Sequence, residues 1–427
     1  MSSRPPSVNR NFAILAVGQL LGRLLAFAVT IHLTRALAAD GFGAIAFATS
    51  VLAYAALVVE LGFDSLGPLE VARGQQPVAA LAQTVVTLRL LLTGAGFAAL
   101  AGFAWLAPVG ASTRAVMLVY GVSLLANAID LSWVFLGSAQ MQSAAIADIV
   151  TQLLQALGAF LLVKQPGDLL RMPTIFLASR ALSVAWLAGV FARRYGAFRP
   201  RIDPGLVRRL LPATLPFSGA NMVGTLLQNF DLVLIGLWLG TRSAGVYGAA
   251  YRVVWLPTIL FTAYLTALRP LLARGSLEGL GAIQVLLWRP TRFVVAAGVG
   301  AALGGILLAQ PLVLLLYGTE YREAARPLQI LLAAFALLVV SRLYRAVLVA
   351  FHHQATDLRI MASAAALNVA LNVVLIRPFG LAGAAFATLA SEAVILAVSR
   401  AVTRRLVGST LSERQAAPAL AKRAAWL

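Results

Sequence analysis

The sequence predicts an all-α integral membrane protein of twelve transmembrane helices in two six-helix lobes, on the basis of three observations. Of the 427 residues, 60% are hydrophobic and only 11% are charged, which leaves too little polar surface to cover a water-soluble globule of this size. The apolar residues form blocks of about 20 to 25, near the length that a helix needs to cross roughly 30 Å of hydrocarbon. A break rich in arginine and proline separates two similar halves.

Each apolar block, bounded by short turns, is one expected helix. The first block is too long for the core of a signal peptide and contains Arg23, so we expect it to be retained. In chain order the twelve expected helices cover approximately 12–36, 41–61, 80–105, 115–137, 143–163, 172–194, 211–239, 245–270, 291–316, 326–350, 358–377 and 381–404. The corresponding domains are an N-terminal lobe (1–195), a basic cytoplasmic linker (196–210), a C-terminal lobe (211–405) and a cytoplasmic tail (406–427).

The position of the cations predicts the orientation, because short loops rich in Lys and Arg stay cytoplasmic. The break between the sixth and seventh helices and the tail are both rich in arginine, so both are expected inside, and with twelve helices the N-terminus shares that side. The cations of the break are Arg193, Arg194, Arg199, Arg201, Arg208 and Arg209. The net charge of +19 therefore indicates topology and attraction to an anionic leaflet, and no nucleic-acid partner.

The opposite loops are short, about 38–42, 106–114, 164–172, 240–245, 317–325 and 377–381, and leave no room for an outer catalytic domain. The chain contains no cysteine and only three histidines. His352 and His353 are adjacent and diverge on a helix, so no metal site and no cofactor are predicted. The sequence does not predict an enzyme.

An internal repeat relates the two halves. LAADGFGAIAFA (37–48) and LGTRSAGVYGAA (239–250) each place a short polar turn before a glycine and a second helix. A looser similarity relates FLGSAQMQ (135–142) to AFHHQAT (350–356). Two matches together with a basic break at the midpoint predict two lobes of six helices in the same orientation.

Several segments carry a family resemblance. NFAILAVGQLLGRLLAFAVTIHLTRALAADGFGAIAFA (11–48), LPFSGANMVGTLLQNFDLVLIGLWLGTRSAGVYGAAYRV (215–253), GTEYREAARPLQIL (318–331) and LNVVLIRPFGLAGAAFATLASE (371–392) resemble, in order and spacing, the Wzx-type polysaccharide flippases of the multidrug/oligosaccharidyl-lipid/polysaccharide (MOP) superfamily. The resemblance spans nearly the whole chain.

This resemblance implies two lobes around a central cavity that opens alternately to the two sides of the bacterial inner membrane. The implied cargo is an oligosaccharide linked to undecaprenyl pyrophosphate, used for surface polysaccharides such as O-antigen or exopolysaccharide. Helices one, two, seven and eight line the cavity in that family. The implied partners are the lipid-linked oligosaccharide, the bilayer, and polysaccharide polymerases and glycosyltransferases.

Charged side chains at bilayer depth are the candidate site residues, because each costs at least about 2.5–3.5 kcal/mol to insert and usually faces a polar cavity or a partner. Arginine suits a pyrophosphate because its fork donates bidentate hydrogen bonds and stays protonated. The candidate headgroup ligands are Arg23, Arg252, Arg342 and Arg345. Other charged groups at this depth are Arg89, Arg180, Asp130, Asp148, Asp231 and Glu392.

Each candidate arginine also has a structural alternative. Arg23 could pair with an acid on a neighbouring helix, and Arg252 could extend to the membrane interface. Arg342 and Arg345 share one helical face and could pair with an acid such as Asp130 or Glu392. Arg89 and Arg180, rated lower, are expected between lobes or at the interface.

Asp231 lies among Asn221, Gln228 and Asn229, a polar concentration that a lipid-facing helix would not keep. It is a candidate for coupling transport to H⁺ or Na⁺, with pairing to Arg252 or Arg23 as the structural alternative. His32 could change its protonation state near neutral pH, and the structural alternative is a helix histidine held by an ordinary hydrogen bond. Pro257 is expected to kink the eighth helix and to act as a hinge.

Three other functions compete with a flippase. A multidrug and toxin extrusion (MATE) antiporter of organic cations would favour a cavity rich in acids and poor in arginine. A membrane-embedded glycosyltransferase, polymerase or ligase would need a catalytic carboxylate or histidine on a sizeable outer loop. A scaffold that has lost transport would not need intact arginines in its cavity.

Overall fold

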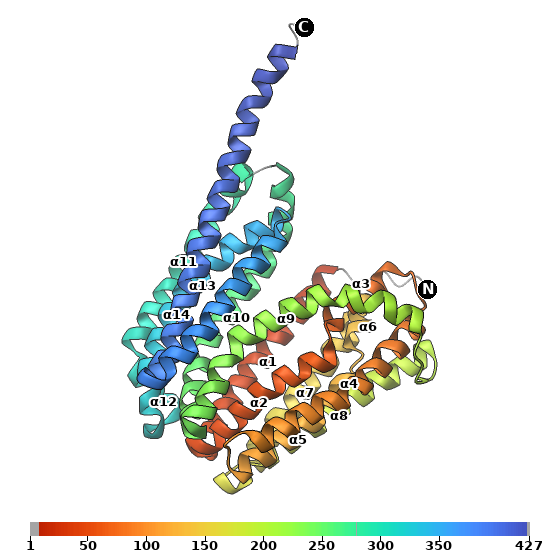
Figure 1. Ribbon diagram of the computed structural model, residues 1–427, viewed down its shortest axis with the longest axis vertical. Coiled ribbons are helices and arrows are strands. Elements are labelled where there is room, and N and C mark those ends of the chain that lie inside the picture. Colours follow the sequence, from red (N-terminus) through yellow and green to blue (C-terminus); the bar gives the residue numbers. More distant parts are fainter. Residues whose placement is uncertain (1–7, 279, 425–427) are drawn as a thin grey trace. The chain divides into compact units, whose positions relative to one another are not determined.

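The chain forms helices throughout the part that the computed structural model describes, residues 8–278 and 280–424, and no strand occurs in these ranges. It divides into two compact units (Figure 1). Unit 1 comprises Met1–Arg252 and Val313–Ala324, and unit 2 comprises Val253–Leu312 and Ala325–Leu427. The predicted division into lobes at 195 and 211 stays a prediction.

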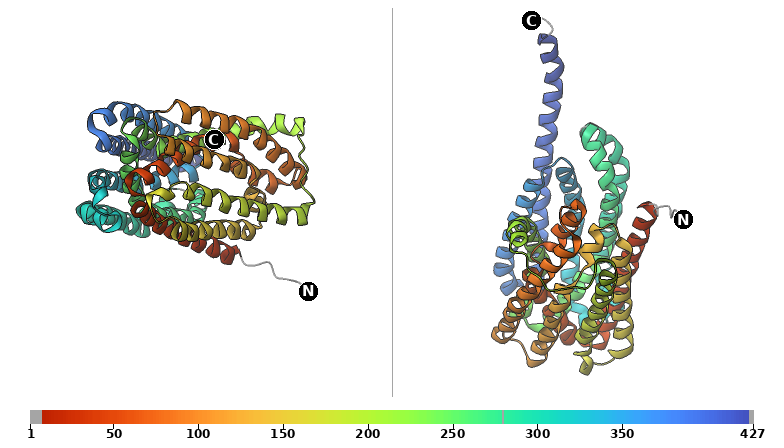
Figure 2. Two further views of the ribbon diagram at one scale, coloured as in Figure 1. Left: turned by 90° about the horizontal axis from the view of Figure 1, so that it is seen from below. Right: turned by 90° about the vertical axis from the view of Figure 1, so that its right-hand side faces the viewer.

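Unit 1 is built from the N-terminal helices together with a short segment from the second half of the chain. Its elements are α1 (Val8–Ala36), α2 (Ala38–Glu60), α3 (Phe63–Arg73), α4 (Val78–Leu106), α5 (Ala111–Ile129), α6 (Ser132–Gly137), α7 (Met141–Leu162), η1 (Pro166–Asp168), α8 (Arg171–Tyr195), α9 (Pro204–Trp238), the start of α10 (Gly240–Glu278), the end of α12 (Ala309–Tyr317) and η2 (Thr319–Ala324). Figure 2 shows these helices from two further directions.

Unit 2 contains the rest of α10, α11 (Leu280–Leu307), the start of α12, α13 (Ala325–Ala350) and α14 (Gln354–Ala424). The long α14 consists of two helices that meet at Gly380, where φ is 55° and ψ is −135°. Only glycine adopts this conformation without strain. The break falls between the predicted helices 358–377 and 381–404.

The membrane class is confirmed, whereas the count of twelve spans is not. Among the described residues, nine helices are long and apolar enough to cross a membrane, or ten if the bent pair Arg292–Leu307 and Ala309–Tyr317 forms one span. The two halves of that pair meet at 76°.

One predicted helix is followed by a helix that was not predicted, and another is broken in the structure. The first, 41–61, ends as predicted, at Glu60 of α2, where Leu61 and Gly62 adopt positive φ angles of 48° and 74°, and a further helix, α3, follows where the sequence predicted a loop. The second, 115–137, is interrupted at Asp130, which accepts hydrogen bonds from Ser132 N–H and Oγ at 2.8 and 2.6 Å. The Asp130 carboxylate thus satisfies one of the N–H groups that the first turn of α6 leaves free.

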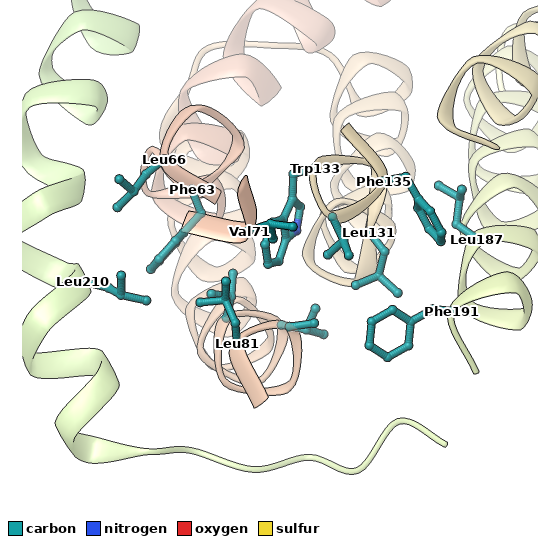
Figure 3. Close-up of a cluster of buried hydrophobic side chains, with 14 of the residues drawn as sticks. Phe63, Leu66, Val71, Leu81, Leu131, Trp133, Phe135, Leu187, Phe191 and Leu210 are labelled. Atoms are coloured by element: carbon teal, nitrogen blue, oxygen red, sulfur yellow. The ribbon is translucent and has the colours of Figure 1, made fainter. Parts of the chain in front are cut away.

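The two half-helices α3 and α6 pack against each other in the core of unit 1 (Figure 3). A Cβ on Gly67 would lie 2.5 Å from the Trp133 ring, and a Cβ on Gly137 would lie 2.6 Å from the carbonyl oxygen of Pro68. The buried cluster around Trp133 also takes in Phe191 from α8 and Leu210 from α9. These breaks are therefore supported by close packing.

The predicted repeat appears as a contact between equivalent backbones within unit 1. A Cβ on Gly43 would overlap the carbonyl oxygen of Thr241, and a Cβ on Gly245 would overlap the carbonyl oxygen of Ala39. Ala39 and Thr241 are equivalent positions of the repeat, as are Gly43 and Gly245. The contact is therefore reciprocal, as expected for two copies related by a local twofold axis.

Three of the loops predicted outside lie together at one end of unit 1. The Glu320 carboxylate accepts the Ala39 N–H at 3.1 Å and lies 3.5 Å from Nη1 of Arg242. Tyr321 donates its hydroxyl to the carbonyl oxygen of Thr34 at 3.3 Å. The turn before α2, the start of α10 and η2 thus share one side, in agreement with the predicted topology.

The Gly43 contact leads to a prediction about stability. Gly43→Val is expected to reduce the yield of folded protein severely, because the new side chain meets the backbone of the α10 turn and the turn cannot move without losing the reciprocal contact. Size-exclusion chromatography and thermal unfolding of the purified protein measure the effect. Gly94→Ala is the matched control, since a Cβ there meets no atom within 4 Å; equal damage in both variants would contradict the interpretation.

Candidate functional site

Three of the arginines at membrane depth are held by carboxylates. Nη2 of Arg89, a residue with no exposed surface, lies 2.7 Å from Asp64. Arg180 donates from Nη2 to Asp130 at 3.0 Å. Arg345 makes a bidentate pair with Asp357 through Nε and Nη2, at 2.6 and 3.0 Å, so this edge of its guanidinium is occupied.

These ion pairs bear on the structural alternatives considered for the arginines at bilayer depth. An ion pair was the structural alternative for Arg345, and one is present, although the partner is Asp357. Asp130 instead pairs with Arg180. Arg89 and Arg180 bind carboxylates of their own unit, and their expected place between lobes or at the interface stays a prediction. The role of Arg345 in binding a headgroup stays a prediction.

Arg342 lies in a polar seam of unit 2. Its Nη1 donates to Thr262 Oγ1 on α10 at 2.8 Å, and Glu392 on α14 is a charged neighbour. Ser341, the preceding residue, donates to Glu392 at 3.2 Å. Arg342 is half-buried, and its side chain joins α13 to two neighbouring helices.

Arg23 differs from the paired arginines. It is exposed on α1, and it takes part in none of the ion pairs among the described side chains. Asp148 on α7 is within electrostatic range but is hydrogen-bonded to Gln152 at 2.8 Å. The neighbouring Gly22 allows α1 to approach α7 closely, because a Cβ there would overlap the Gln152 side chain. Among the described side chains, no carboxylate forms an ion pair with the Arg23 guanidinium.

Arg252 is also exposed, near the start of α10. Its electrostatic neighbours are the hydroxyl groups of Tyr120 on α5 and Tyr317 on α12. Both tyrosines are almost fully buried, at 2% and 3% exposure. The exposed guanidinium can bind a phosphoryl oxygen by charge-assisted hydrogen bonds, whereas the two hydroxyls beside it are buried.

Asp231 is a buried carboxylate on α9, 2% exposed. Tyr247 donates its hydroxyl to Oδ2 at 2.7 Å, and the Leu232 N–H donates to Oδ1 at 2.8 Å. Pairing with Arg23, one of the structural alternatives, is not observed among the described side chains. Two neutral donors, an N–H and a hydroxyl, therefore hold the Asp231 carboxyl group.

His32 and Pro257 have clear local settings. The His32 Nε2 lies 2.7 Å from the carbonyl oxygen of Val163 and 3.1 Å from that of Ala159, at the C-terminus of α7, so His32 is the hydrogen-bonded histidine of the simpler alternative.

Pro257 lies within α10, which continues as a helix from Gly240 to Glu278. Its proposed role as a hinge stays a prediction.

Sequence reasoning missed the carboxylates at the first helix break. Glu60 is the last residue of α2, and Asp64 lies in the first turn of α3. The charged neighbours of Glu60 are Asp64, Arg89, Arg180 and Asp130. The ELGFDS sequence carried a signal for this cluster, because two acids at the end of an apolar block require cations nearby.

Comparison with protein families places the chain among known proteins. Residues 8–276 match the family model described as "Polysaccharide biosynthesis protein". The chain belongs to this polysaccharide biosynthesis family. The matched region contains unit 1 up to Arg252, including Arg23 and Asp231. A comparison with curated proteins found no significant match to the chain.

Solved structures support the fold of this polysaccharide biosynthesis protein. It is similar to the lipid II flippase MurJ in an inward closed conformation, with a TM-score of 0.77 and 12% identity over 92% of this chain and 87% of the other. It is similar to an inward-facing MATE family multidrug resistance transporter of the MOP superfamily, with a TM-score of 0.73 and 14% identity over 93% and 98%. A MOP superfamily transporter from Pyrococcus furiosus gives a TM-score of 0.58 and 15% identity over 93% and 96%. The family match and these likenesses show a polysaccharide biosynthesis protein with a MurJ- and MATE-like helical fold.

Proposed function

We propose that the protein is an alternating-access flippase that moves an undecaprenyl-pyrophosphate-linked oligosaccharide across the bacterial inner membrane for surface polysaccharide assembly. The family match and the MurJ-like fold support a flippase. The observation that carries the choice of an anionic cargo is Arg23, an exposed cation within an apolar helix that forms no ion pair among the described side chains.

Arg23 and Arg252 would bind the pyrophosphate, each by charge-assisted hydrogen bonds. Arg342 and Arg345 are weaker candidates, because their forks already bind Thr262 and Asp357. A MATE-type antiporter shares the fold, but an organic cation would be repelled by an exposed arginine. Polymerases and glycosyltransferases would supply and consume the cargo, and both chain termini would face the cytoplasm.

Reconstitution into liposomes tests this function. Flipping of a fluorescent undecaprenyl-pyrophosphate-linked sugar by the purified protein is expected, whereas an organic cation such as ethidium should not be transported. Transport of the cation without flipping of the lipid would support the MATE alternative and overturn the proposal.

Asp231 would couple transport to an ion gradient. Asp231→Asn removes the charge while keeping an acceptor for Tyr247. The flipping rate is therefore expected to stop responding to a proton or sodium gradient. With a gradient imposed, it is expected to be at least tenfold below the wild-type rate. Fluorescent flipping in liposomes with and without the gradient measures this. Tyr247→Phe, which removes only the donor at 2.7 Å, should keep the response; a normal gradient response of Asp231→Asn would contradict the coupling role.

Pro257 would allow α10 to bend during transport, because proline removes one main-chain hydrogen bond within a helix. The boundary between the compact units falls between Arg252 and Val253 on the same helix. A bend in this region would let the two units move while both remain internally packed.

A further inference from the structure

The linker between α8 and α9 carries a set of arginines that the proposed transport does not use. Four of these arginines lie in the flanking helices α8 and α9, two lie within the linker, and all six are exposed: Arg193, Arg194, Arg199, Arg201, Arg208 and Arg209. The linker, residues 196–203, lies at the end of unit 1 that the charge pattern predicts to be cytoplasmic. We call these six residues and the linker the arginine strap.

Packing of unit 1 holds the strap in place. Phe198 packs against the buried cluster around Trp133, and the Arg201 N–H donates to Thr87 Oγ1 on α4 at 3.2 Å. The coil that joins α8 to α9 crosses the foot of Figure 3, below Leu81. Since Phe198 faces the core, Arg199 and Arg201 remain on the solvent side.

Among the described residues, the acids near the strap pair with Arg209 alone of its six arginines. Asp203 caps α9, where it accepts the N–H groups of Gly205 and Leu206 at 2.9 and 3.1 Å. Glu70 is 7% exposed and is shared between Arg73 and Arg209. Arg193, Arg194, Arg199, Arg201 and Arg208 form none of the ion pairs of the described residues.

The chemistry of the strap fits phosphate. Every cation in it is arginine, whose planar fork binds a phosphodiester through two parallel hydrogen bonds. Arginine supplies nearly all the cations of this chain, so its use alone does not single out the strap. Topology needs only positive charge, whereas the strap is also packed onto the core through Phe198. Exposed apolar side chains flank the strap: Ile202 at 42%, Leu211 at 40% and Leu215 at 63%. Phosphate ligands beside exposed apolar groups match a lipid with an anionic headgroup and acyl chains.

We propose that the arginine strap is a binding surface for anionic phospholipid headgroups of the leaflet that faces it. The site is independent of the transported cargo and of Arg23. Each arginine near an anionic surface contributes about 1 kcal/mol, so removing two of them should weaken binding about 30-fold at low salt, since about 1.4 kcal/mol corresponds to tenfold.

The test measures binding of fluorescent phosphatidylglycerol and phosphatidylcholine to the full-length protein in neutral detergent. The wild type is expected to prefer phosphatidylglycerol and to lose the preference in high salt. The double variant Arg199→Gln/Arg201→Gln should lose about 30-fold in affinity. The control Arg322→Gln/Arg326→Gln removes two exposed arginines from the η2 region and should bind as the wild type does.

Three outcomes would overturn the proposal. One is unchanged phosphatidylglycerol binding by the strap variant, and another is an equal loss in the control, which would mean that net charge alone acts. The third is full displacement of phosphatidylglycerol by millimolar inorganic phosphate, which would indicate a site for free phosphate. Flipping activity is measured in parallel, so a failed flippase function would leave the result on lipid binding unaffected.

Discussion

Replacing Arg23 by alanine is expected to abolish polysaccharide export while the protein accumulates and folds normally. The expected loss is about 10- to 100-fold in flipping rate, because a hydrogen bond to a charged group contributes about 1.5–3 kcal/mol. The fold should tolerate the change, since the side chain is exposed and holds no carboxylate among the described residues. Flipping by reconstituted protein and surface polysaccharide in cells both measure the effect.

Two companion variants separate binding from packing at this position. Arg23→Lys keeps the charge but not the bidentate fork, so partial activity is expected. Leu24→Ala changes an exposed neighbour, 48% accessible, and should leave export unchanged. Full activity of Arg23→Ala would remove Arg23 from the site.

Asp64→Ala is expected to produce the largest loss of stability at a single charged residue. It leaves the guanidinium of Arg89 buried without its carboxylate, and two further nitrogens of Arg89, Nε and Nη1, already have no hydrogen-bond partner. Breaking a buried pair costs about 3–5 kcal/mol, and the lower end applies because the Asp64 side chain is 47% exposed. Thermal unfolding in detergent measures the change.

A second pair and a double variant serve as controls for Asp64. Arg171→Ala breaks the pair with Asp168, in which the arginine is 57% exposed, and should cost at most about 1 kcal/mol. Asp64→Ala combined with Arg89→Met removes the buried charge as well and should recover part of the stability. A double variant less stable than Asp64→Ala alone would show that Arg89 stabilises the fold by contacts other than this pair.

The sequence predicted the helical segments well and their interruptions poorly. Apolar length is a local property, so the blocks were readable from composition alone. The short helix α3 after Leu61 and the break at Asp130 were not, because both depend on packing between α3 and α6 that brings distant residues together. The repeat was visible as a pattern around Gly43 and Gly245, but their mutual contact appears only in the folded chain.

The candidate site divides in the same way. The sequence identified the charged residues at bilayer depth, including Arg23, Arg345 and Asp231, because a charge within an apolar block is conspicuous. It could not separate ligands from structural pairs. Asp357 binds Arg345 and Tyr247 binds Asp231, and neither partner was predicted.

By itself the sequence determined the membrane class, the order of most helices and the repeat, since these follow from hydrophobic length and the order of residues along the chain. The side on which the arginines gather stays a prediction from the distribution of charge. Only the tertiary structure decided which arginines are neutralised. A guanidinium in a low-dielectric interior takes the carboxylate that folding brings within hydrogen-bond distance, and that carboxylate comes from another helix, as Asp64 does for Arg89 and Asp130 for Arg180. Arg23 stands apart because folding brings it no such partner among the described residues.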